Sequence, residues 1–122
     1  MKFGNTTPIL RSFDEIKARE FYLAFLEFNL DWEHRFSEDL PLYMQISKGS
    51  CVLHISEHHG DSSPGTALRI QVSNIEAYHE LLLGKSYKYS RPAIQEMPWG
   101  SKDMTISDPF GNRLIFTSAV ST

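Results

Sequence analysis

The sequence predicts an α+β fold of two tandem βαβββ modules, and three observations support this prediction. The first is an internal repeat: residues 43–55, YMQISKGSCVLHI, match residues 103–116, DMTISDPFGNRLIF, at an offset of 60 residues with one inserted residue. The second is that both halves contain a strand, a helix and three strands in the same order. The third is size and composition, since 122 residues with 41% hydrophobic and 22% charged residues are typical of one globular domain. Chance is the alternative explanation of the repeat, and the shared order of elements argues against it.

The first module begins with a short strand, TPILRS, followed by a helix over SFDEIKAREFYLAFLEF. Ser12 or Asp14 is a suitable N-cap, and the acidic residues of the first turn suit the helix dipole. The apolar residues at close to helical spacing are Ile16, Phe21, Ala24, Phe25 and Phe28. A strand over LDWEHRF and the hairpin over 43–55 complete the module.

The second module repeats this order, with a strand over TALRIQVS and a helix over SNIEAYHELLLGK. Ser73 or Asn74 caps the helix and Gly84 ends it. Its apolar stripe consists of Ile75, Tyr78, Leu81 and Leu82. A strand over SYKYSRP and the hairpin over 103–116 follow, and EHHGDSSPG joins the halves as a loop. We therefore expect one domain over 1–122, with module 1 at about 5–59 and module 2 at about 65–119.

Two such modules form open, curved half-barrel sheets whose concave faces need a cover. Pairing the modules, within one chain or between two, creates a cleft of the kind in which small ligands bind. We expect a homodimer with this cleft at the interface, with the first strand either kept or exchanged between subunits.

Charge and hydropathy exclude several partners. A net charge of -3 and scattered basic residues argue against nucleic acid, which requires a clustered basic surface. No apolar run approaches the ~20 residues that span a bilayer, and MKFGNTTPIL lacks the apolar region of a signal peptide. One cysteine excludes an internal disulfide framework. We expect a cytoplasmic protein that binds neither nucleic acid nor membrane.

The sequence resembles the vicinal oxygen chelate superfamily, which includes glyoxalase I, extradiol dioxygenases, fosfomycin-resistance enzymes and bleomycin-resistance proteins. The resemblance rests on the two βαβββ modules, FDEIKAREFYLAFLEF after the first strand and SDPFGNRLIF in the last hairpin, and covers roughly residues 6 to 118. PWG followed by SDPFGN, together with LDWEHRF and LHISEHHGD, is most similar to the bleomycin-resistance branch. The motif is specific for fold and weak for function, because this fold serves enzymes and binders alike.

The resemblance also implies where a metal would bind. Enzymes of the superfamily place one ligand on the first and one on the last strand of each module, which correspond here to Thr7, His54, Ala67 and Ile115. Only His54 offers a good donor, because alanine and isoleucine have no lone pair and threonine is a poor ligand. We therefore expect no metal, no cofactor and no catalytic residue. His58 and His59 fall in the linker and are expected to be solvated.

The resemblance implies a binding groove of aromatic and acidic residues. The predicted ligand-binding residues are Trp99, Asp31, Trp32, Ser56, His54, Phe36 and Glu96. Trp99 lies in the turn-prone MPWG and either contacts ligand or plugs the end of the sheet. Trp32 is equally compatible with the core, and one of the pairs Trp32 and His34 or Glu33 and Arg35 faces the cleft. Asp108, Pro109, Gly111 and Asn112 are interpreted as a structural turn.

Bleomycin-resistance proteins are dimers that stack the flat bithiazole of the drug on aromatic rings and attract its cationic tail with acidic groups. The leading hypothesis is accordingly an antibiotic-binding protein that sequesters a bleomycin-type ligand, free or metal-loaded, without turnover. The alternatives are a metal-dependent enzyme of the superfamily and a metal-free binder of another flat or cationic small molecule.

Overall fold

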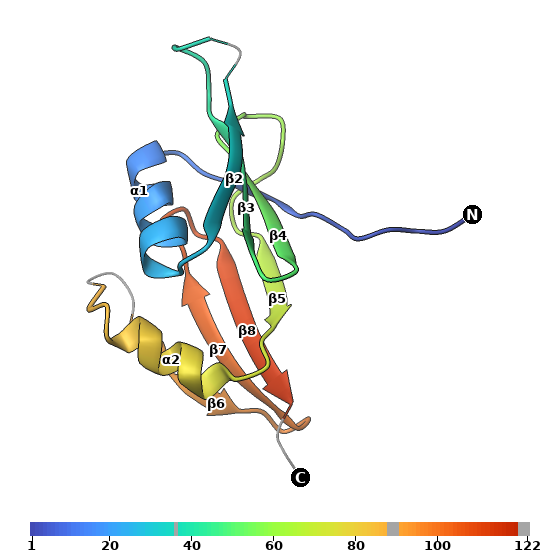
Figure 1. Cartoon of the computed structure of the whole chain (residues 1–122), viewed down its shortest axis with the longest axis vertical. Coiled ribbons are helices and arrows are strands. Elements are labelled where there is room, and N and C mark those ends of the chain that lie inside the picture. The colour runs from blue at the N-terminus through green and yellow to red at the C-terminus, as the bar shows by residue number, and fades with distance from the viewer. Residues whose placement is uncertain (36, 88–90, 120–122) are drawn as a thin grey trace. The chain divides into compact units, whose positions relative to one another are not determined.

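The computed structural model of the chain describes residues 1–35, 37–87 and 91–119 (Figure 1). The chain divides into two compact units, Met1–Pro64 and Gly65–Thr122. Each unit contains one four-stranded sheet and the order βαβββ. The predicted α+β class with two βαβββ modules is thereby confirmed.

The first unit is built from β1, α1, a π-helical turn η1, β2, β3 and β4. Their bounds are Ile9–Arg11, Glu15–Arg19, Glu20–Phe25, Asn29–His34, Tyr43–Lys48 and Cys51–Ser56. The strand order in the sheet is β1-β4-β3-β2, with β1 parallel to β4 and the other pairs antiparallel. The first strand therefore pairs with the last strand of its own module.

The helix of the first unit is capped by Asp14, whose Oδ1 accepts a hydrogen bond from the Lys17 amide at 3.0 Å. The prediction that Ile16 belongs to the apolar stripe is wrong, because its side chain is 77% exposed. It lies five residues before Phe21, which places it roughly 140° around the helix from that buried ring. Ala24 is exposed as well, and the buried positions of α1 and η1 are Ala18, Phe21, Tyr22 and Phe25.

The second unit is built from β5, α2, β6, β7 and β8, in the sheet order β5-β8-β7-β6. Their bounds are Ala67–Gln71, Ile75–Leu83, Ile94–Glu96, Ser101–Ser107 and Arg113–Ala119. Asn74 caps α2 through its side chain and Gly84 ends it. The prediction that Leu81 belongs to the buried stripe is wrong, since its side chain is 40% exposed. The strand predicted at 86–92 is found at Ile94–Glu96 instead, and residues 88–90 lie outside the described part of the chain.

The two hairpins have equivalent registers, as the alignment of the repeat requires. Ile46 pairs with Leu53 in the first unit, and Ile106 pairs with Leu114 in the second. These positions are buried in both copies and form the apolar face of each sheet. The alternate positions form the opposite face of each sheet, and there the side chains are mostly polar.

The turn of the last hairpin is held by a buried carboxylate. Asp108 Oδ1 accepts hydrogen bonds from the amides of Phe110 and Asn112 at 2.9 and 2.8 Å. Asp108 Oδ2 accepts a third bond from Asn112 Nδ2 at 2.8 Å, and Gly111 has a φ of 90°. These contacts account for DPFGN as a structural motif. Among the helices that the structure describes, none is long and apolar enough to cross a membrane.

Candidate functional site

A β-bulge places Asp31 and Trp32 on the same face of the first sheet. The register of β2 against β3 shifts between Leu30 and Trp32, so that Asp31 has no position of its own in the ladder. The carboxylate of Asp31 accepts hydrogen bonds from Gln45 Nε2 at 3.1 Å and from Ser47 Oγ at 2.9 Å. The Trp32 ring stacks on Tyr43 with the centroids 5.9 Å apart and an interplanar angle of 10°. Strict alternation would have separated these two side chains.

Trp32 is therefore a surface residue of this face rather than a core residue. Its side chain is 43% exposed, and its ring also meets that of His54 edge-on at 5.3 Å. The two pairs of residues on β2 lie on opposite faces of the sheet, and which pair contacts a ligand stays a prediction. Glu33 forms an ion pair with Arg19 of α1, so that Glu33 faces the helix. The opposite face carries Trp32 and His34.

His54 lies at the centre of this face with both ring nitrogens engaged. Nδ1 is 2.5 Å from the Tyr43 hydroxyl, and Nε2 is 2.9 Å from Gln45 Oε1. Burial lowers the pKa of His54 below its ordinary value, because the charged imidazolium loses solvation. The neutral ring is thus the form that this environment favours.

These residues do not fit the metal that enzymes of the resembled superfamily hold. A metal at His54 would have to displace either Tyr43 or Gln45 from the ring. Ile115 and Ala67, at the corresponding positions of the second unit, have no donor atom. Within residues 1–35, 37–87 and 91–119, no three His, Cys, Asp or Glu side chains come together as metal ligands.

Ser56 is fully buried at the end of β4 and organises the loop that follows. Its Oγ donates to Asp61 Oδ2 at 2.6 Å and accepts the amide of His58 at 3.0 Å. Arg11 adds a bond to the carbonyl of His59 at 3.2 Å. These contacts bring His58 and Asp61 against Trp32 and Tyr43, so that His58 is half-buried rather than solvated as predicted. A direct contact between Ser56 and a ligand stays a prediction.

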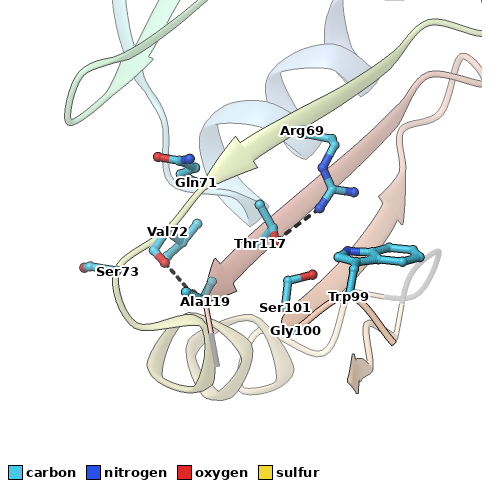
Figure 2. Close-up of a pocket in the computed structure, with 10 residues that line it drawn as sticks. Arg69, Gln71, Val72, Ser73, Trp99, Gly100, Ser101, Thr117 and Ala119 are labelled. Carbon is cyan, nitrogen blue, oxygen red and sulfur yellow. Dashed lines mark hydrogen bonds between the residues drawn. The ribbon is translucent and has the colours of Figure 1, made fainter. Parts of the chain in front are cut away.

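The second unit has a pocket of about 660 Å³ on the polar face of its sheet (Figure 2). Trp99 stands at its edge in the turn between β6 and β7, where the Gly100 amide bonds to the Met97 carbonyl at 3.0 Å. The ring is 66% exposed, so Trp99 does not plug the sheet. Gly100 has a φ of 97°, a conformation that glycine adopts without strain.

A buried carboxylate, that of Asp103, accepts hydrogen bonds from three residues that line this second-unit pocket. Asp103 accepts two hydrogen bonds from Arg69, at 3.2 and 3.3 Å, and further bonds from Ser101 and Thr117 at 3.0 and 2.7 Å. Burial tends to raise the pKa of Asp103, but these four bonds outweigh it and hold the pKa below its ordinary value. Figure 2 shows the Arg69 guanidinium reaching Thr117 on the side of the sheet where Trp99 stands.

Sequence reasoning missed Arg69, Asp103, Tyr43 and Gln45. For the last three, the alternation of the predicted hairpins contained the signal, because Tyr43 and Gln45 lie opposite Ser56 and His54, and Asp103 lies opposite Thr117. Of the predicted residues, Asp31, Trp32 and His54 come together in the first unit. Trp99 lies in the second unit, and Phe36 lies outside the described residues. Glu96 pairs with Lys102, which reaches Glu76 of α2, and so lies on the helix side, away from Asp103.

The chain is similar in structure to proteins with different activities. A bleomycin-binding protein from Streptomyces verticillus, solved with copper(II)-bleomycin, has 27% identity and a TM-score of 0.71, with 100% of this chain and 99% of that chain covered. A bleomycin resistance determinant encoded on the transposon Tn5 has 18% identity and a TM-score of 0.73, with coverages of 96% and 98%. A glyoxalase-related enzyme from Clostridium phytofermentans has 18% identity and a TM-score of 0.78, with 98% of each chain covered.

These neighbours share the fold, and both binders and an enzyme are among them. No curated protein matches the chain in sequence. A family model described as "Glyoxalase superfamily protein" matches residues 1–122. The chain therefore belongs to the glyoxalase superfamily.

Proposed function

We propose that this protein binds a bleomycin-type glycopeptide antibiotic and protects by sequestration, without turnover. The observation that carries the proposal is the exposed Trp99 ring beside the second-unit pocket. An indole that is 66% exposed on a turn offers a flat apolar surface at little cost in entropy. A ligand with a planar heteroaromatic part would stack on it.

The acidic and aromatic character of the first-unit face supports the same ligand class. Asp31 presents a carboxylate on the same face of the sheet as the Trp32 and Tyr43 rings, and the chain carries a net charge of -3. Cation-π and ion-pair contacts of this kind favour a cationic tail. The bleomycin-binding protein from Streptomyces verticillus shares 27% identity over the whole chain, which agrees with this choice of ligand.

A protein that sequesters its ligand needs affinity rather than a reactive group. The only cysteine, Cys51, has a pKa raised by burial, which disfavours the thiolate nucleophile. His54 has both nitrogens occupied by neighbours.

We propose that the protein acts in the cytoplasm as a homodimer with the binding groove at the subunit interface.

The test is a titration of the purified protein with copper-loaded and metal-free bleomycin, followed by tryptophan fluorescence and calorimetry. We expect saturable binding near one drug per subunit, with a dissociation constant in the micromolar range or below. Trp99→Ala should weaken binding about tenfold, equivalent to about 1.4 kcal/mol, and Trp99→Phe should weaken it less because a ring is retained. Mass spectrometry should recover the drug unchanged.

The chain has two tryptophans, which makes the fluorescence assignable. Trp32→Phe leaves Trp99 as the only reporter, and Trp99→Phe leaves Trp32. Sedimentation velocity gives the oligomeric state with and without drug. An absence of binding to either form of bleomycin would refute the proposal, and so would a chemically altered drug after incubation.

A further inference from the structure

The first unit has a pocket of its own, with aromatic walls. It measures about 490 Å³ and is lined by Trp32, His34, Tyr43, His58 and Asp61. All five residues lie within Met1–Pro64, and none of them lines the Trp99 pocket. The lining contains two large aromatic rings, two imidazoles and a single carboxylate.

The aromatic wall is fixed in place by its neighbours. Trp32 and Tyr43 stack nearly parallel, with an interplanar angle of 10°. The His54 ring meets both edge-on, at 5.3 Å from Trp32 and 5.1 Å from Tyr43. The Tyr43 hydroxyl is hydrogen-bonded to His54 Nδ1. Rings held this way can present a preformed surface and lose little freedom when a ligand binds.

The carboxylate is held against this wall by the loop after β4. Asp61 Oδ2 accepts the Ser56 hydroxyl at 2.6 Å, and the Asp61 amide bonds to the His58 carbonyl at 3.2 Å. The pKa of Tyr43 is raised, first by burial and then by the negative charge of Asp61. None of the five described lining residues is a lysine or arginine that would neutralise Asp61 inside the pocket.

We propose that this first-unit pocket binds a small organic cation, of the alkylammonium or quaternary ammonium class. The cation lies against the parts of the Trp32 and Tyr43 rings that line the pocket, and Asp61 supplies the counter-charge. Electron-rich ring faces attract a cation that gives up part of its hydration, and a single carboxylate completes the neutralisation. A neutral ligand of the same shape gains only the apolar contact.

The probes are tetramethylammonium and choline, with 3,3-dimethylbutan-1-ol as the uncharged counterpart of choline. Binding is followed by calorimetry and by the fluorescence of Trp32 in the Trp99→Phe variant, with sodium chloride as the ionic-strength control. We expect saturable binding of both cations, at least tenfold weaker binding of the alcohol, and no response to sodium. Equal affinity for choline and the alcohol would overturn the proposal, as would the absence of saturable binding of either cation.

Two substitutions locate the site. Asp61→Asn keeps one oxygen that can accept the Ser56 hydroxyl, removes the negative charge and replaces the other oxygen by an amide nitrogen. Choline affinity should fall about tenfold, while the unfolding midpoint stays close to that of the wild type. The same change at Asp39, an exposed loop residue outside the pocket lining, is the matched control and should leave affinity unchanged. Trp32→Leu should abolish binding. Unchanged choline affinity in either pocket variant would overturn the proposal.

This inference uses the Trp32 and Tyr43 rings that the proposed function assigns to the cationic tail of the drug, and in that respect it rests on the proposed function, but the two can fail separately. The drug titration responds to Trp99→Ala, whereas the cation titration responds to Asp61→Asn. Choline binding without bleomycin binding would leave this inference standing and refute only the proposed function. Bleomycin binding without choline binding would do the reverse.

Discussion

Asp31 sets the tautomer of His54 through the amide group of Gln45. A carboxylate only accepts hydrogen bonds, so the Gln45 nitrogen, 3.1 Å from Asp31 Oδ2, must be the donor of that contact. The Gln45 oxygen then faces His54 Nε2 at 2.9 Å, which requires a proton on Nε2. Nδ1 is left to accept the Tyr43 hydroxyl. The four side chains, from the bulge in β2 and from β3 and β4, thus form one chain of hydrogen bonds in which each donor and acceptor is fixed.

Replacing Gln45 by glutamate should raise the pKa of His54. A carboxylate at this position accepts the Nε2 proton with a full negative charge, and the nearby Asp31 adds to the negative potential. We expect an increase of about one unit or more relative to the wild-type protein. An NMR titration of the imidazole carbon-bound protons measures it. Gln45→Met, which removes the hydrogen bond without adding charge, is the control, and a similar rise in both variants would contradict this account.

The depressed pKa of His54 gives stability a definite pH dependence. Because burial holds the folded pKa below the ordinary value of 6.5, the unfolded chain binds the proton more readily. The contribution of the neutral ring is fully present above pH 6.5 and is lost as the pH falls through the folded pKa. Urea unfolding between about pH 8 and pH 5 should show the wild type losing stability relative to His54→Gln as the pH decreases. If the wild type instead became more stable relative to His54→Gln as the pH falls, the predicted direction of the pH dependence would be wrong.

The fold was largely predictable from the sequence, because its signals are local. Asn74 and Asp14 have the chemistry of caps, and the repeat of Met44 and Ile46 at Met104 and Ile106 identifies equivalent strands. The errors at Ile16 and Leu81 concern how far an apolar stripe extends around a helix. That boundary depends on which neighbours cover the flank, and the sequence of one helix does not contain that information.

The site was less predictable, because it depends on register and on a bulge. Asp31 and Trp32 are adjacent in sequence, so alternation assigns them to opposite faces, and only the shift in pairing brings them together. The partnership of Arg69 with Asp103 joins two strands 34 residues apart in the chain. No periodic pattern connects two such positions, and the contact follows only from the sheet order β5-β8-β7.

Ser56→Ala should destabilise the first unit and loosen the wall of its pocket. The substitution removes the bond to Asp61 and leaves the His58 amide without this acceptor. We expect a loss of about 1–3 kcal/mol in the free energy of unfolding, as for buried hydrogen bonds to charged groups. Urea denaturation monitored by circular dichroism gives the value. Ser50→Ala, an exposed change in the turn between β3 and β4, should cost much less, and equal effects would argue against a special role of Ser56.

Arg69→Met should destabilise the second unit at neutral pH and reduce its sensitivity to acid. Two of the four bonds that Asp103 accepts from the described side chains come from Arg69, and their loss leaves a buried carboxylate with hydroxyl donors from Ser101 and Thr117. We expect a cost of about 1–3 kcal/mol. In the wild type, the depressed pKa of Asp103 contributes stability above the ordinary value of 3.8, and that contribution is lost as the pH falls through the folded pKa.

In the variant the pKa of Asp103 rises, so the stability difference from the wild type should shrink as the pH falls below about 4. Arg113→Met is the matched control, since Arg113 is exposed at the start of β8, outside the Asp103 network and the lining of the Trp99 pocket. Urea unfolding of the three proteins at neutral and acidic pH measures both effects. If Arg69→Met were as stable as Arg113→Met at pH 7, the ion pair between Arg69 and Asp103 would make no special contribution to the stability of the second unit.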